Sequence, residues 1–264
     1  MFVYLPLAPF HPSFSRYQAP PLYKIQGRGL YGMILSMERK LKFSIGEFYH
    51  IYSRGVDKRN IFTNQDDYIR FTKLLFLCNG TEPIVFRLIQ NQPLDKIERG
   101  KKLASVGAYC LMPNHFHLLV RETTEGGITK YLGKLLTSYS MYFNKKHERV
   151  GTLFSSRFHA VHADSDEYLR YLFSYIHLNP VKIIKPNWRE QNLADLDRSL
   201  IMKHLSAYPY SSYQDYASGN QNNRGQILNR EDFPEYFQSV HDFSDFINDW
   251  LAYNDPIQGR GLYP

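Results

Sequence analysis

Short apolar runs, some alternating with polar residues, and stretches of helical period divide the chain into elements. The runs predict strands at residues 48–53, 84–89, 103–111, 115–122 and 153–162. The helical stretches cover residues 66–77, 128–147 and 165–178. A serine cap at the start and Pro180 just beyond the end delimit the last helix. Leaving aside the short run at 84–89, the order predicts an α+β fold, an antiparallel sheet of ferredoxin-like type with helices packed on one face.

Both ends of the chain depart from this pattern. Residues 1–36 are rich in Pro, Gly and Tyr without a clear period, and we predict a poorly ordered leader. Met33 and Met37 are alternative starts that would make this leader an artefact of the gene model. The elements fall within residues 37–185, and residues 186–264 form an acidic, Tyr-rich extension that either covers the sheet or sits apart.

Composition narrows the classes of partner and compartment. The formal net charge is +7, yet residues 186–264 hold 6 Lys and Arg against 11 Asp and Glu, so the basic character belongs to residues 1–185. This favours a polyanionic partner such as nucleic acid, with simple solubility as the alternative. Two cysteines without a Cys-x-x-Cys pair fit the reducing cytoplasm. No apolar stretch approaches the length of a membrane span, so no membrane partner is expected.

A His-x-His pair lies inside one apolar run. Because strand side chains alternate between faces, His115 and His117 project to one side and Phe116 and Leu118 point into the core. Two imidazoles about 7 Å apart can share a divalent ion. The alternatives are histidines with a structural role and a zinc-stabilised domain, although structural zinc usually takes four Cys or His ligands.

The helix before Pro180 offers a third ligand and a nucleophile. Tyr175 and Asn179 are four residues apart and therefore share a helix face. The amide oxygen of Asn179 suits a hard ion such as Mg²⁺ or Mn²⁺. A phenol is a weak nucleophile at neutral pH, but a metal that polarises a phosphodiester makes its attack feasible. Tyr168 and Tyr171 share the helix and are alternative nucleophiles.

Three motifs together resemble one family. They are the Met-Pro-Asn-His-Phe-His run at 112–117, the Gly-Thr-Leu-Phe-Ser-Ser-Arg-Phe segment at 151–158 and the Tyr-Ile-His-Leu-Asn-Pro-Val segment at 175–181. In this order they resemble the single-tyrosine HUH transposases, and more narrowly the tyrosine transposases associated with repetitive extragenic palindromes (REP), relatives of the IS200-type enzymes. The resemblance extends roughly over residues 46–216 and implies that residues 37–185 are an HUH catalytic domain.

The resemblance also implies a chemistry. The enzyme would be a metal-dependent endonuclease and strand transferase acting on single-stranded DNA beside a hairpin such as a REP-like palindrome. His115, His117 and Asn179 would hold Mg²⁺ or Mn²⁺, and Tyr175 would keep the 5′ phosphate. The expected phosphate contacts are Arg54, Lys58, Arg59 and Arg157. We favour a monomer over a dimer. The alternative function is a noncatalytic, domesticated transposase that binds DNA or RNA hairpins as a regulator.

Overall fold

The computed structural model describes residues 42–83, 85–89, 92–190, 193–218 and 225–252. The predicted leader, residues 1–36, lies outside the described residues. The strands are β1 (Phe48–Arg54), β2 (Ala104–Met112), β3 (His115–Glu122) and β4 (His159–His162). The helices are α1 (Gln65–Leu77), α2 (Phe86–Ile89), α3 (Gly127–Lys146), α4 (Asp166–Leu178), α5 (Val181–Ile184), α6 (Asp195–Ala207), α7 (Tyr213–Ala217) and α8 (Val240–Ala252). Short 3-10 turns are η1 (Val56–Lys58), η2 (Leu94–Lys96), η3 (Trp188–Glu190), η4 (Gly225–Ile227) and η5 (Arg230–Asp232).

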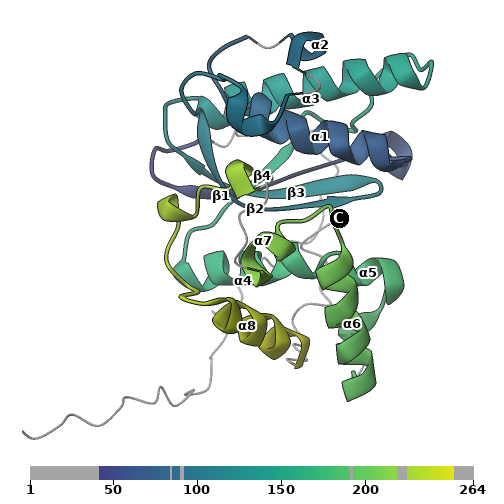
Figure 1. Ribbon diagram of the computed structural model, residues 1–264, viewed down its shortest axis with the longest axis vertical. Helices are drawn as coiled ribbons and strands as arrows, with labels where there is room; N and C mark the ends of the chain where they lie inside the picture. The colour runs from purple at the N-terminus through teal and green to yellow at the C-terminus, as the bar shows by residue number, and fades with distance from the viewer. Residues whose placement is uncertain (1–41, 84, 90–91, 191–192, 219–224, 253–264) are drawn as a thin grey trace, which may run out of the picture. The chain divides into compact units, whose positions relative to one another are not determined.

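The four strands form one antiparallel sheet in the order β2-β3-β1-β4. The helices α1 and α3 each connect two strands and lie together on one face of this sheet (Figure 1). This strand–helix–strand–strand–helix–strand arrangement is that of the ferredoxin-like fold, so the predicted α+β class is confirmed. The register places Tyr52 opposite His117 and Arg54 opposite His115.

Helices cover the second face of the sheet as well, so the expectation of helices on one face alone is wrong. The helix α4 packs on β2 and β3 from the side opposite α1 and α3, and α7 and α8 lie on that same side, with α8 beyond α4 (Figure 1). Every residue of β2 is buried. A strand buried on both faces reads as a continuous apolar run rather than an alternating one. The unbroken run in β2 was the signal for a second layer of helices.

The acidic extension covers the sheet and does not sit apart. A segment before α7 runs along the outer edge of β2, where the Leu111 N–H donates to the Tyr210 carbonyl (2.8 Å) and the Ser212 N–H to the Tyr109 carbonyl (3.0 Å). The Tyr216 hydroxyl donates to the Gly107 carbonyl at 2.7 Å. These bonds occupy the polar groups of an edge strand that would otherwise be open to pairing with another chain. The division of the chain into domains at residue 185 stays a prediction.

Two predicted strands differ in the structure. Residues Phe86–Ile89 form the helical turn α2, because a short apolar run fits a strand or a helix equally well. The last strand contains only His159–His162, whereas Phe154 forms an isolated bridge with Gly55. Between them the backbone bends, and the Ser155 N–H donates to the Arg54 carbonyl at 2.9 Å. The motif at 151–158 therefore lies beside the end of β1.

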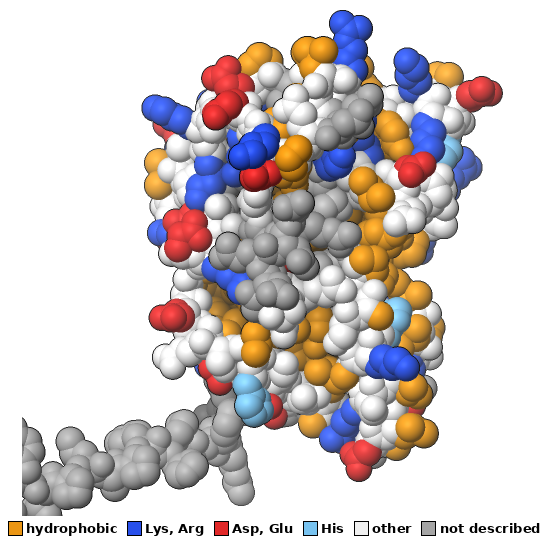
Figure 2. All heavy atoms as spheres, in the orientation of Figure 1, with side chains coloured by type: hydrophobic (Ala, Val, Ile, Leu, Met, Phe, Trp, Pro, Cys, Tyr) orange, Lys and Arg blue, Asp and Glu red, His pale blue; other side chains and the backbone are white. Residues whose placement is uncertain are grey.

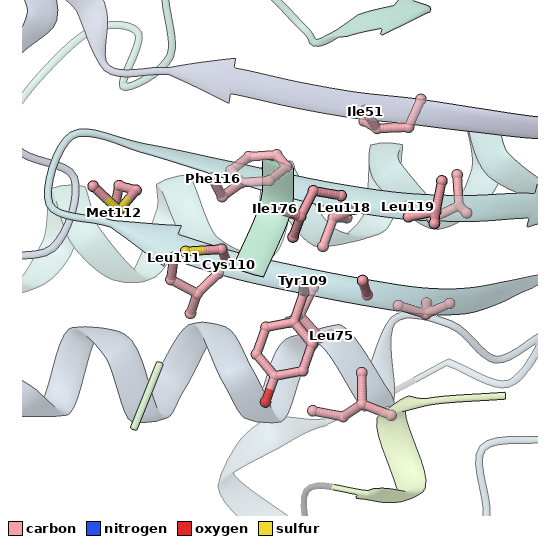
Figure 3. Packing of buried hydrophobic residues seen from close by; sticks show 14 of the residues in the cluster. Ile51, Leu75, Tyr109, Cys110, Leu111, Met112, Phe116, Leu118, Leu119 and Ile176 are labelled. Carbon is pink, nitrogen blue, oxygen red and sulfur yellow. The ribbon is translucent and has the colours of Figure 1, made fainter. Parts of the chain in front are cut away.

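The core lies between the sheet and its helices (Figure 3). Phe116 and Leu118 are fully buried, as predicted. Phe116 faces α1, since its ring centroid lies 5.2 Å from that of Phe71. The alternate residues of β3, His115 and His117, consequently face α4.

On the face shown in Figure 2, Lys and Arg gather over the end that carries α2 and α3, interspersed with Asp and Glu. Within the described ranges, none of the helices has the length and apolar character needed to cross a membrane.

Candidate active site

The half-buried His115 lies at the start of β3, and its ring is held by the residue before it. Its Nδ1 lies 2.6 Å from the Asn114 Oδ1, and the Asn114 Nδ2 donates to the Lys58 carbonyl at 3.2 Å. The second bond orients the amide, so its oxygen faces the histidine and can only accept. Nδ1 of His115 therefore carries the proton, and Nε2 is the nitrogen with a free lone pair.

His117 is buried, and a third histidine holds it. The His117 Nδ1 lies 2.9 Å from the Nε2 of His50 on β1. In the part of the chain that the structure describes, the His117 Nε2 is buried without a hydrogen-bond partner. A buried polar atom without a partner is uncommon in folded proteins and points to a missing ligand. His117 thus directs one nitrogen to a protein partner, and its other nitrogen has a lone pair that a ligand could use.

Burial keeps these imidazoles neutral. Desolvation, helped by the charges of Arg54 and Lys182, lowers the pKa of His115 to about 3. Desolvation and the neighbouring histidines hold the pKa of His117 well below its usual value, and burial lowers that of His50 to about 3. A neutral imidazole is the form that binds a metal ion.

The helix α4 brings Tyr175 onto this cluster. The Ser165 hydroxyl accepts from the Tyr168 N–H at 3.2 Å, so the predicted cap starts the helix. The Tyr175 ring centroid lies 5.3 Å from that of His117 and 5.6 Å from that of His50. Tyr175 is only 1% exposed, so the predicted nucleophile is buried.

The alternative tyrosines of α4 form a row of rings with Tyr175, in which the Tyr171 centroid lies 5.8 Å from that of Tyr175. Tyr171 packs against the Trp250 ring at 5.5 Å, and Tyr168 stacks on Tyr171 at 6.0 Å. Tyr175 is the tyrosine of α4 whose ring packs against the histidines. This packing favours Tyr175 over its two rivals as the nucleophile.

Asn179 ends α4 one turn after Tyr175. Its Nδ2 donates to the Tyr175 carbonyl at 2.8 Å, which leaves Oδ1 buried without a hydrogen-bond partner among the described residues. Among these residues no three His, Cys, Asp or Glu side chains are grouped to hold a metal. A metal site here must therefore combine the two histidines with a ligand of another type. The unpartnered Oδ1 of Asn179 and Nε2 of His117 fit a divalent ion that accepts oxygen and imidazole.

Three cations surround the predicted nucleophile and its neighbours, and two of them were missed from the sequence. Arg54, which was predicted, lies opposite His115 in the sheet. Lys182 places its Nζ 5.7 Å from the Tyr175 ring centroid, and Arg189 places its Cζ at 5.2 Å. Burial and the charges of Arg189 and Arg54 lower the pKa of Lys182 to about 8. Lys182 is seven residues after Tyr175, which is about two helical turns, and this spacing is the feature of the sequence that could have identified it.

The other predicted phosphate contacts have exposed side chains. Lys58 and Arg59 are exposed in and after η1, where the Arg59 Nη2 lies 3.7 Å from the Asp57 Oδ2. Arg157 is exposed in the bend before β4. The structure therefore brings His115, His117, Tyr175 and Arg54 together and leaves these three cations on the surface.

The sheet therefore carries a histidine pair, and α4 places the ring of Tyr175 against it. Residues 92–179 match the model of the family described as "Transposase IS200 like", and this segment contains both histidines, Tyr175 and Asn179. Over this segment, about a third of its length, the chain is similar to the IS200-like transposases.

The chain is also similar in part to a solved structure. A REP-associated tyrosine transposase bound to a REP hairpin aligns at 14% identity and a TM-score of 0.38, over 67% of this chain and 82% of that one. No curated protein matches the chain.

Proposed function

We propose that the protein is a metal-dependent endonuclease and strand transferase that acts on single-stranded DNA beside a hairpin. The observation that carries this proposal is the packing of His117 and Tyr175 across β3 and α4, at 5.3 Å between ring centroids. Both residues lie in the segment that matches the transposase family. When bound, Mg²⁺ or Mn²⁺ would act as a Lewis acid on the phosphodiester.

His115, His117 and Asn179 are the proposed ligands. The Nδ1 of each histidine already has a neighbour, so Nε2 is the donor that each can offer. Nε2 is the unpartnered nitrogen of His117, and Oδ1 is the unpartnered oxygen of Asn179. The bonds to Asn114 and His50 fix the ring orientation, as partners of metal-bound histidines usually do.

Tyr175 is the proposed nucleophile. Its phenolic oxygen forms a bond to phosphorus and gives its proton to water, while the bond from phosphorus to the 3′ oxygen breaks. The departing oxygen takes up a proton and leaves as a 3′ hydroxyl, and the 5′ phosphate stays on the tyrosine. Attack by a 3′ hydroxyl on this phosphotyrosine reverses the step and joins strands without ATP. Because Tyr175 is 1% exposed, DNA must displace the side chains that cover it.

A pair of tyrosine variants on one helix tests this assignment. The substrates are oligonucleotides that carry any imperfect palindromes found in the DNA flanking the gene, incubated with Mn²⁺ and resolved on denaturing gels. We expect the wild type and Tyr171→Phe to form a covalent adduct, and Tyr175→Phe to form none while still binding the hairpin. An adduct that persists in Tyr175→Phe would show that the nucleophile is another residue.

The burial of Tyr175 favours one alternative, a noncatalytic regulator that binds DNA or RNA hairpins. It predicts hairpin binding by the wild type with neither cleavage nor adduct in Mg²⁺ or Mn²⁺. We also propose a cytoplasmic protein that works as a monomer. Analytical ultracentrifugation with and without a hairpin distinguishes this monomer from a dimer.

A further inference from the structure

Two basic side chains beyond the family match lie against the predicted nucleophile. The helix α5 begins at Val181, directly after Pro180, and brings Lys182 back to the side of Tyr175. Arg189 reaches the same ring from η3. Both residues lie outside residues 92–179, so the matched segment alone does not contain this part of the site.

The charges of Arg54, Lys182 and Arg189 are not neutralised by an ion pair within the described part of the chain. None of the ion pairs observed there includes Arg54, Lys182 or Arg189. The Nε atoms of Arg54 and Arg189 are buried without a hydrogen-bond partner among the described residues. By contrast, Lys185 pairs with Asp197 at 2.7 Å.

Cations gathered at low exposure without a counter-charge are unfavourable unless a ligand supplies one. The ligand must be an anion that reaches both Tyr175 and His115, because Lys182 and Arg189 flank the tyrosine and Arg54 lies beside the histidine. A phosphate of a nucleic acid backbone has this charge and accepts hydrogen bonds from guanidinium and ammonium groups.

We propose that Lys182 and Arg189, together with Arg54, form the binding site for the DNA phosphate that Tyr175 attacks. The inference rests on the proposed function and adds to it two residues and a role. Lys182 and Arg189 bind phosphate oxygens from the tyrosine side, and Arg54 binds them from the histidine side. Because the contacts are to phosphate, the site holds the strand without reading its bases.

The test measures DNA binding without cleavage. Tyr175→Phe protein is titrated in EDTA with fluorescein-labelled oligothymidylate at a series of salt concentrations. Lys182→Met and Arg189→Met are added to it separately, since methionine keeps an unbranched apolar chain and removes the charge. The matched control is Lys185→Met, which removes an ammonium group that is already paired with Asp197.

Each phosphate contact to single-stranded nucleic acid contributes about 0.7 to the slope of log affinity against log salt. We expect the slope to become shallower by about 0.7 in Lys182→Met and in Arg189→Met, and to stay unchanged in Lys185→Met. Slopes that match the parent in both site variants would overturn the proposal, and so would a parent that does not bind the oligothymidylate.

Two further measurements keep this result distinct from the fate of the proposed function. A thermal scan shows whether the methionine variants are folded. If they are not, Lys182→Arg and Arg189→Lys are used instead, and both should retain the parental slope. A shallower slope in both would overturn the proposal. The adduct assay is run in parallel on chains that retain Tyr175. Shallower slopes without any wild-type adduct support the phosphate site and contradict the nuclease. A wild-type adduct together with unchanged slopes would support the nuclease and contradict the phosphate site.

Discussion

Two buried polar clusters, one in the α1–α3 layer and one under α4, differ in how completely their polar atoms are paired. Asp67 on α1 accepts from the Thr63 backbone and hydroxyl, from Tyr142 and from Lys146, at 2.7–3.1 Å. Under α4, the His117 Nε2 and the Asn179 Oδ1 lack hydrogen-bond partners within the described residues.

From this difference we infer that the first cluster stabilises the fold and that the second binds a ligand. A buried carboxylate with several hydrogen bonds recovers its desolvation penalty, whereas an unpaired buried atom does not. Function is therefore expected where the polar groups are incompletely paired. In this chain that place is β3 and α4, where the histidines and Tyr175 meet.

The largest expected effect contrasts the two faces of β3. Phe116→Ala should lower the free energy of unfolding by about 3–5 kcal/mol, because it empties a packed site against α1. Replacing both His50 and His117 by Leu should change it by less than about 1 kcal/mol or raise it, since both partners of one bond are removed together. Urea denaturation measures both. A double variant as unstable as Phe116→Ala would contradict the distinction between the faces.

The second effect concerns His50, whose Nε2 lies 2.9 Å from the His117 Nδ1. Loss of this partner by His50→Ala should weaken Mn²⁺ binding about 10- to 100-fold, the usual effect of removing a group that orients a metal ligand. Isothermal titration calorimetry measures the affinity without any substrate. His162→Ala, on β4 and paired with Glu47, is the matched control and should bind as the wild type does. Equal affinities in the two variants would exclude this role.

The third effect is a change of stability with pH. Burial lowers the pKa of His50 and of His177 to about 3, so the unfolded chain binds more protons below its pKa near 6.5 and stability falls as pH drops from there toward 3. Burial raises the pKa of Asp67, but hydrogen bonds from Thr63, Lys146 and Tyr142 outweigh it and lower the value to about 2.

The Asp67 contribution is therefore present above pH 4 and lost between about pH 4 and 2. Urea denaturation from pH 7 to 2 should show both windows. Asp67→Asn should reduce the loss of stability between about pH 4 and 2, and it should leave the loss caused by the histidines unchanged. A loss of the upper window in this variant would show that the two clusters are coupled.

The fold was largely predictable because its signals are local. Alternation located β1 and β3, and the Ser165 cap with Pro180 delimited α4. The second helical layer is not among the predictions, although the unbroken apolar run of β2 is typical of a strand buried on both faces. The prediction of a strand at residues 84–89 was wrong, because so short a run has too little periodicity to distinguish a strand from a helix.

The site was predictable only in part because its remaining members depend on tertiary pairing. The pair His115 and His117 is visible from spacing, but His50 joins it through the register of β1 against β3. Lys182 follows Pro180, which predicts the end of the helix. The helix α5 nevertheless begins at the next residue and brings Lys182 close to Tyr175. Arg189 approaches from a separate turn, and no sequence period connects it to the site.

The central claim is that the cluster under α4 delivers Tyr175 to a DNA phosphate. The most direct test is peptide mapping by mass spectrometry after the wild type has reacted with a hairpin oligonucleotide and Mn²⁺ and the DNA has been digested. We expect a nucleotide phosphate on Tyr175, in a peptide that carries no modification when EDTA is present. A nucleotide on Tyr171, Tyr168 or Tyr52, or cleaved DNA without any modified tyrosine, would contradict it.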